Sequence, residues 1–356
     1  MATEESARSL TDRLLAVARI VALDVRGLLA LPVGLFGYWI TGRTAQVGYQ
    51  SFIWLSCVTN GRLNDVMSSM VARIRPKIPF SSRAGVLGNL TASDVERHVR
   101  KLREDGFVLF PAVLPAAVCD RLTRFALETP ASVRRMDHEP EAVEKRTARF
   151  DAVAPLGVRY DYETSALLDN IDVQALLADR SLISIAQEYL GSRPVADVLS
   201  MWWHTNYHAQ PDSQAAQYFH FDMDRIKWVK VFVYLTDVGP DNGPHMFIKG
   251  SHRTGGIPGT FLRRGYARLM DDEVFRQYPP ERRMEFCAPR GSIIIEDTRG
   301  LHKGVNVRGA ARLMLQMQFS NSLFGTNCPR TRLGTIRDAT LQSMLQQAPS
   351  IYRQYL

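Results

Sequence analysis

The second half of the chain is a series of short apolar runs separated by turn residues. The runs cover residues 198–207, 218–222, 229–237, 244–249, 292–297 and 313–319. Runs of this length, apolar or alternating and bounded by turns, predict β-strands. Asp241-Asn242-Gly243, between the third and fourth runs, tolerates positive φ and predicts a tight hairpin. The second half is therefore expected to form an antiparallel sandwich or barrel.

The first 89 residues have a different character. Their patterns are helical, and residues 77–89 form a connector rich in Pro, Ser and Gly. We predict a helical extension over residues 1–89 and a main domain over residues 90–356. Ser93 and Glu96 have the spacing of a capping box and predict the first helix of that domain. Residues 262–285 are a helix-like, Arg-rich insertion, and we expect it to form a lid over the site.

The amino-acid composition excludes several classes of protein. The 356 residues carry 44 Lys and Arg against 36 Asp and Glu, a net charge of +8, and 46% of them are hydrophobic. These values exclude a disordered or collagen-like chain. The four cysteines lie far apart without a C-x-x-C pair, so we predict neither a zinc knuckle nor a disulfide framework, and a reducing cytoplasmic location. The basic residues form no aromatic-interleaved motif, and we expect no nucleic-acid binding.

Two uncharged stretches mark the extension. Residues 27–42 contain Pro32, Gly34 and Gly37 and fall short of the roughly 20 apolar residues that a membrane-spanning helix needs. Residues 44–61 form the second stretch. We favour packing of both stretches on the main domain or on a second copy of the chain in a homo-oligomer. A weak peripheral membrane contact is the alternative.

Three residues of the main domain suggest a metal site. His220 and Asp222 are two residues apart on a predicted strand, which puts both side chains on one face with Cα atoms about 6–7 Å apart. His302 follows another predicted strand in a Gly-rich turn. Two imidazoles and one carboxylate suit a non-haem Fe(II) site with open positions. A His-x-Asp pair alone is weak evidence, because such pairs are often hydrogen-bonded core residues.

Arg312 stands at the start of the last apolar run. A guanidinium among Leu and Met side chains needs an anionic partner. The far carboxylate of a 2-oxoglutarate co-substrate would supply one, and so would an acidic residue of the chain itself. Both interpretations are open from the residues alone.

In several ordered pieces, residues 90–325 resemble the phytanoyl-CoA dioxygenase family, which comprises oxygenases that depend on Fe(II) and 2-oxoglutarate. The pieces are Asp105-Gly106-Phe107-Val108, His220-Phe221-Asp222, Asp241-Asn242-Gly243-Pro244, Gly250-Ser251-His252, and Gly300-Leu301-His302 with Arg312. The resemblance implies a mainly β fold with helical additions, in which a double-stranded β-helix, the jelly-roll or cupin-like core, carries the N-terminal helical extension.

The resemblance also implies roles for residues. His220, Asp222 and His302 become ligands of Fe²⁺, and Arg312 binds the C5 carboxylate of 2-oxoglutarate. Phe232 and Thr205 fall where the co-substrate pocket is expected. Many members of the family carry a Ser two residues beyond the distal histidine, where this chain has Gly304.

Other residues near the motifs are interpreted as pocket residues. Trp203, His204 and His245 are candidates for the substrate pocket, since further metal ligands would close the positions that O₂ needs. Trp202 and Trp203 alternate in direction, so one of them is expected in the core.

The predicted function is that of an Fe(II)- and 2-oxoglutarate-dependent dioxygenase. It would hydroxylate an unactivated C–H bond of a small molecule such as a natural product, lipid or acyl compound, with succinate and CO₂ as co-products. The arginines of the insertion favour an anionic and partly apolar substrate. Two alternatives remain at this stage: a catalytically silent β-helix that only binds ligands, and a zinc hydrolase that uses the same three residues.

Overall fold

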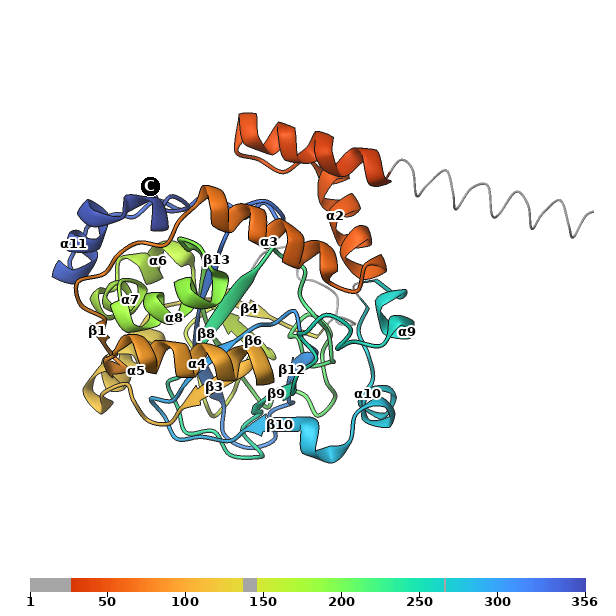
Figure 1. Ribbon diagram of the computed structural model, residues 1–356. Helices are drawn as coiled ribbons and strands as arrows, with labels where there is room; N and C mark the ends of the chain where they lie inside the picture. Colours follow the sequence, from red (N-terminus) through yellow and green to blue (C-terminus); the bar gives the residue numbers. More distant parts are fainter. Residues whose placement is uncertain (1–26, 137–145, 266) are drawn as a thin grey trace, which may run out of the picture.

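The computed structural model describes residues 27–136, 146–265 and 267–356, and its centre is an antiparallel sheet of eight strands (Figure 1). In spatial order the strands are β3 (Phe107–Phe110), β11 (Ile293–Glu296), β8 (Trp228–Tyr234), β13 (Arg312–Ser320), β7 (Val195–His204), β6 (Arg159–Asp161), β4 (Ala131–Arg134) and β5 (Thr147–Ala148). The long apolar runs predicted as strands lie in its middle, where both faces of a strand are buried.

A second, smaller sheet consists of β10 (Arg283–Phe286), β9 (His245–Ile248) and β12 (His302–Gly304). The segment that contains His220 adds to its edge through an antiparallel bridge between His220 and His302. The two sheets form the double-stranded β-helix, so the predicted fold is confirmed. A two-stranded hairpin of β1 (Ala84–Gly85) and β2 (Gly88–Asn89) precedes the main domain.

The turn at Asp241-Asn242-Gly243 differs from its prediction. Gly243 has φ 66°, as the sequence indicates, but β8 belongs to the large sheet and β9 to the small one. The turn therefore links two sheets and does not close a hairpin. The positive φ of Gly243 determines the local reversal of the chain. Which strands pair on either side of the turn depends on tertiary contacts, which the turn residues do not reveal.

Helices cover the outer face of the large sheet. Val229, Val231 and Val233 of β8 point into this outer core, while Phe232 and Tyr234 point to the inside of the barrel. The helices of the main domain are α4 (Ala92–Asp105), α5 (Ala116–Glu128), α6 (Thr164–Leu168), α7 (Ile171–Leu177), α8 (Arg180–Leu190) and α11 (Ala339–Gln347), with the short 3-10 turn η2 (Pro349–Ile351) near the C-terminus.

Helix α4 begins earlier than its predicted cap. Thr91 caps it: the Thr91 hydroxyl accepts from the Asp94 amide, and the Asp94 carboxylate accepts from the Thr91 amide. The predicted Ser93 and Glu96 pair therefore lies inside the helix. Both spacings fit a capping box, and the cap at Thr91 starts the helix two residues earlier than predicted.

The N-terminal helices pack on the chain segment that carries His220 and Asp222. They are a helix over residues 27–41, α2 (Gln46–Val58) and α3 (Arg62–Ile74). Their buried side chains share one apolar cluster with the segment around His220; its members include Phe52, Leu55, Met67, Val71, Phe219, Phe221 and Met223. Packing on the main domain is thus confirmed, while the division at residue 90 stays a prediction. Among the described residues, no helix is long and apolar enough to cross a membrane.

Phe52 is the most informative residue of this contact. It is fully buried, and its ring lies edge-on to that of Phe324 with centroids 5.8 Å apart. We expect Phe52→Ala to lower the free energy of unfolding by about 3–5 kcal/mol, because it removes a buried aromatic ring and leaves a cavity. Urea unfolding measures this change. Val47→Ala, at a largely exposed position of the same helix, is the control and should change stability little.

The insertion folds as α9 (Gly259–Leu262), α10 (Asp271–Gln277) and the 3-10 turn η1 (Pro280–Arg282), and it leads into β10. It is tied to the metal-ligand strands by the Lys303–Asp271 ion pair at 2.6 Å and by a bridge between Phe219 and Leu269. Several of its arginines are engaged within the insertion: Arg264 pairs with Glu273, Arg276 with Asp272, and Arg283 donates to the carbonyl of Phe275. These three arginines therefore have their partners within the insertion.

Candidate metal centre

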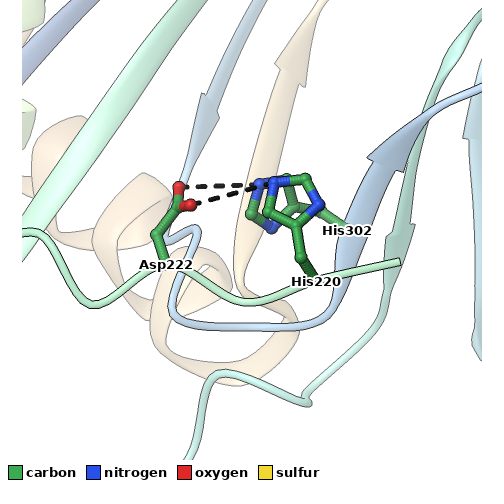
Figure 2. A group of neighbouring side chains, drawn as sticks. All are labelled: His220, Asp222 and His302. Atoms are coloured by element: carbon green, nitrogen blue, oxygen red, sulfur yellow. Dashed lines mark ion pairs between the residues drawn. The ribbon is translucent and has the colours of Figure 1, made fainter. Parts of the chain in front are cut away.

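His220, Asp222 and His302 come together as one buried group (Figure 2). One ligand atom of each lies within 4.8 Å of the others. Nε2 of His220 is 3.8 Å from Oδ1 of Asp222, and Nε2 of His302 is 3.6 Å from Oδ2. Backbone hydrogen bonds in both directions join residues 220 and 302, with N···O distances of 3.0 and 2.9 Å. The three donors are thus held by the backbone of two adjacent strand segments.

Alternation along the segment aims the ligands inward. His220 and Asp222 face the barrel, while Phe219, Phe221 and Met223 face the cluster built with the N-terminal helices. The extension therefore supports the metal-ligand segment from behind. It contributes no side chain to the triad itself.

Carbonyl groups orient both imidazoles. Nδ1 of His220 lies 2.9 Å from the carbonyl oxygen of Tyr218, and Nδ1 of His302 lies 2.9 Å from that of Gly300. A carbonyl can only accept, so Nδ1 carries the proton in each ring. The lone pair is then on Nε2, the atom that faces the centre of the triad.

The charge states suit a divalent cation. Burial lowers the pKa of His302 to about 4 and that of His220 well below its usual value, so both rings are neutral. Burial opposes ionisation of Asp222, but the ammonium group of Lys230 holds the pKa of this carboxyl below its usual value. Two neutral imidazoles and one carboxylate within reach of a single ion fit Fe(II), which accepts this donor set.

Lys230 holds the carboxylate of the triad. Its ammonium lies 2.5 Å from Oδ2 of Asp222 and 3.5 Å from the carboxylate of Asp224. Next to it in register on β11 is Glu296, which is buried and lies 3.0 Å from Nε2 of His245. Burial raises the pKa of Glu296 well above its usual value. The sequence analysis missed both residues, although a charge inside the apolar runs WVKVFVY and IIIE is the signal that identifies them.

Arg312 is fully buried at the start of β13. It donates to the carbonyl of Gly243 and, over 2.7 Å, to Nδ1 of His204, while its Nε is buried with no hydrogen-bond partner. No carboxylate in the described part of the chain forms an ion pair with it, so an intramolecular partner is not seen there. Across the sheet, His204 stands in register with Arg312 on one side and Arg159 on the other.

His204 has a defined tautomer. Arg312 can only donate, so Nδ1 of His204 accepts and Nε2 carries the proton. That Nε2 is buried and has no hydrogen-bond partner among the described residues. Burial, together with the charges of Arg312 and Arg159, lowers the pKa of His204 well below its usual value, so the ring stays neutral. An oriented N–H donor therefore lies beside the guanidinium.

Gly304 closes the same corner. A Cβ built on Gly304 would lie 3.5 Å from Nη2 of Arg312 and 3.7 Å from Cε1 of His204, both ordinary contact distances. A serine at this position would thus point at the two residues just described. In this chain the imidazole of His204 is the side chain that occupies this corner.

The two other residues predicted for the co-substrate pocket, Phe232 and Thr205, differ in where their side chains lie. Phe232 lies on the inner face with its ring 4.9 Å from that of His245, which in turn is 5.6 Å from His302. The hydroxyl of Thr205 donates to the carbonyl of Gly157 and is not directed at the triad by any contact described.

The prediction that Trp203 lines the substrate pocket needs correction. Trp203 packs in the outer core, stacked on Phe150 at 4.2 Å, and donates to Tyr162. Trp202 is on the inner face, 6.1 Å from the ring of His204 and under the guanidinium of Arg159. Because side chains alternate along a strand, only one of the two tryptophans can face the inside of the barrel. Both faces of β7 carry apolar residues, so the sequence does not show which face is the inner one.

The chain matches one protein family and is similar to several solved structures. The family model described as "Phytanoyl-CoA dioxygenase (PhyH)" matches residues 102–313. No curated protein matches the chain at a significant level. Among solved structures, the chain is similar to the epimerase SnoN in complex with Fe³⁺, alpha ketoglutarate and nogalamycin RO, with 18% identity, TM-score 0.48 and coverage of 69% of this chain and 94% of that one.

Two further solved structures are similar. EctD from S. alaskensis with bound Fe is 18% identical with TM-score 0.47, and the match covers 75% of this chain and 95% of that one. HygX from Streptomyces hygroscopicus with nickel and 2-oxoglutarate bound is 16% identical with TM-score 0.42, and the match covers 66% of this chain and 89% of that one.

Proposed function

The chain belongs to the phytanoyl-CoA dioxygenase family of Fe(II)- and 2-oxoglutarate-dependent oxygenases, and from this premise we propose that it hydroxylates an unactivated C–H bond of a small molecule. His220, Asp222 and His302 are the proposed Fe(II) ligands. The observation that carries the proposal is the convergence of these three donors on the inner side of the barrel, with two neutral rings and one carboxylate. The zinc hydrolase alternative leaves the buried Arg312 without a role.

The protein's own residues prepare the site. When bound, Fe(II) and 2-oxoglutarate supply the oxidation, in which O₂ is consumed and succinate and CO₂ are released. The carbonyls of Tyr218 and Gly300 keep both Nε2 atoms available, and Lys230 fixes the orientation of the Asp222 carboxylate. Because a carboxylate occupies position 222, no ligand position is opened there for a halide, which favours hydroxylation over halogenation.

The proposed co-substrate pocket centres on Arg312. Its guanidinium binds the C5 carboxylate of 2-oxoglutarate as a charge-assisted pair. We place the Nε2–H of His204 beside it as a second donor to the same carboxylate, in the role that a serine at position 304 has in many members of the family. The buried, unpaired Nε2 of His204 supports this assignment. Phe232 forms a wall of the pocket. Thr205 is left out, since its hydroxyl already donates to a backbone carbonyl.

His204→Ala is expected to weaken binding of 2-oxoglutarate at least about tenfold, the effect of losing one hydrogen bond to a charged group. Adding Gly304→Ser to that variant should restore most of the affinity, because the serine hydroxyl would reach the same corner without a clash. Calorimetric titration of the Fe(II)-loaded protein with 2-oxoglutarate under anaerobic conditions measures both effects. Unchanged affinity in His204→Ala would remove the histidine from the pocket.

The proposed substrate is anionic and partly apolar, and the insertion over residues 262–285 is its proposed lid. The positive charge of Arg268, within the insertion, is one of the minor causes that lower the pKa of His220, after burial and His302. Succinate release tests the function: purified protein with Fe(II), 2-oxoglutarate and O₂ is assayed against a panel of acyl, lipid and natural-product carboxylates and phosphates. Substrate-stimulated succinate with a product 16 mass units heavier, the mass of one oxygen atom, would support hydroxylation. Succinate released without that product would still support a 2-oxoglutarate-dependent oxygenase but would contradict hydroxylation.

A further inference from the structure

The helix over residues 27–41 is apolar on both of its faces. Its inner face contacts the protein through Leu31 and Tyr38, and at Gly34, where an added Cβ would lie 2.6 Å from the Cα of Gly48 on α2. Its outer face carries large apolar side chains that are each 54–79% exposed: Leu28, Leu29, Val33, Phe36, Trp39 and Ile40. A helix that is apolar all round is normally buried on all sides.

The exposed residues form a continuous stripe. Leu29, Val33, Phe36 and Ile40 are separated by four, three and four positions, the spacing of one helical face. We call the six exposed residues of this helix the outer apolar face. A second exposed stripe, Val66, Met70 and Ile74, lies on α3. Figure 1 shows the helix over residues 27–41 at one end of the molecule, beyond α2 and α3.

Within residues 27–136, 146–265 and 267–356, the charged side chains next to this helix are arginines that form no ion pair with a carboxylate. Between residues 25 and 64 the sequence contains no Asp or Glu. Arg353 donates to the hydroxyl of Tyr38 at 3.4 Å, and the backbone amide of Arg193 donates to the carbonyl of Arg75. Burial and the charges of Arg353 and Arg193 lower the pKa of Arg75 to about 10. No described carboxylate forms an ion pair with these three arginines, and Nε of Arg193 is buried without a partner.

We propose that the helix over residues 27–41 is an interfacial anchor that lies in the surface of an anionic lipid bilayer. Its outer apolar face lies among the acyl chains, and Arg75, Arg193 and Arg353 beside it bind headgroup phosphates. Among the described residues no helix is long and apolar enough to cross a membrane, and an apolar face of this kind suits a helix that lies in the plane of the bilayer surface. Trp39, the most exposed residue of the face, stands near the helix end, and Trp is enriched at the membrane–water interface.

Charge complementarity favours a lipid surface over a second copy of this chain. A symmetric contact between two copies would bring the unpaired arginines of both near the same interface, where they repel each other. Headgroup phosphates instead neutralise them, and guanidinium groups bind phosphate through two parallel hydrogen bonds.

Flotation of the full-length protein with vesicles tests the proposal. Vesicles of phosphatidylcholine alone are compared with vesicles that also contain phosphatidylglycerol. We expect binding to the anionic vesicles, a blue shift of tryptophan emission that Trp39→Phe removes, and release at high salt. The double variant Val33→Glu/Phe36→Glu should bind at least about tenfold more weakly. Val153→Glu is the matched control, since Val153 is 94% exposed elsewhere on the surface, and it should bind as the wild type does.

Several results would contradict the anchor. Absence of vesicle binding, or equal binding to neutral and anionic vesicles, would overturn it, and so would unchanged binding of Val33→Glu/Phe36→Glu. Sedimentation equilibrium provides the alternative outcome: a dimer that this double variant dissociates, without vesicle binding, would identify the face as a contact between copies. Circular dichroism of the double variant, expected to match the wild type because both residues are exposed, shows that lost binding is not unfolding.

Discussion

His302→Ala is expected to abolish 2-oxoglutarate turnover and to lower bound Fe(II) from one ion per chain to a small fraction of that value. The reason is geometric: His302 supplies one of three donors, and two remaining ligands on one strand segment hold a divalent ion weakly. The fold should persist, because His302 stands at the start of β12 and its ring is not part of an apolar cluster. Iron content after anaerobic reconstitution, together with succinate release, measures the two effects.

A matched control uses another buried histidine. His252 is nearly as buried as His302, but its ring bonds to the carbonyl of Arg103 and lies outside the triad. His252→Ala should lose some stability and keep its iron. If His302→Ala bound as much iron as the wild type, the ligand assignment would be refuted. If His252→Ala lost its iron while remaining folded, the selectivity of the triad would be refuted.

Arg312→Ala is expected to raise the dissociation constant for 2-oxoglutarate about ten- to a hundredfold. This range corresponds to the loss of a charge-assisted pair worth about 1.5–3 kcal/mol. Fe(II) binding should change little, since Arg312 does not contact the triad in any interaction described. Calorimetric titrations with Fe(II) and then with 2-oxoglutarate separate the two ligands.

Arg308→Ala is the control for that prediction. Arg308 lies four residues upstream of Arg312 in an exposed position. Its replacement should leave 2-oxoglutarate binding unchanged. A larger loss in Arg308→Ala than in Arg312→Ala would show that the co-substrate binds elsewhere. Arg312→Lys should fall between wild type and Arg312→Ala, because it keeps the charge but loses the planar fork.

The sequence predicted the central strands of the barrel because local patterns mark them. Runs such as 229–237 and 313–319 are apolar over most of their length, and the turns between them contain Gly, Asn or Asp. The run 218–222, predicted as a strand, forms only isolated bridges, and the short strands β4, β5 and β6 were not predicted. The convergence of His302 on His220 required more than local pattern. It followed from family resemblance, since no periodicity relates two residues eighty positions apart.

The features that the sequence did not reveal depend on which face of a strand is inside. On β7, Trp202 and Trp203 are both buried, so hydrophobicity does not identify the inner one. The same difficulty concealed Lys230 and Glu296, whose side chains lie inside the barrel and contact Asp222 and His245, respectively. The support of the metal-ligand segment by the N-terminal helices is likewise a tertiary contact between distant segments, for which the sequence offered only unassigned apolar surface.

An anaerobic titration of the wild-type protein with Fe(II), followed by 2-oxoglutarate, tests the central claim most directly. Charge-transfer absorption develops when 2-oxoglutarate chelates Fe(II), so it reports both ligands at one site. We predict one Fe(II) per chain, appearance of the band on addition of 2-oxoglutarate, and its absence at the same concentrations in Asp222→Ala. A band of equal intensity in Asp222→Ala, or 2-oxoglutarate that binds to the wild type without any change in absorption, would contradict the account.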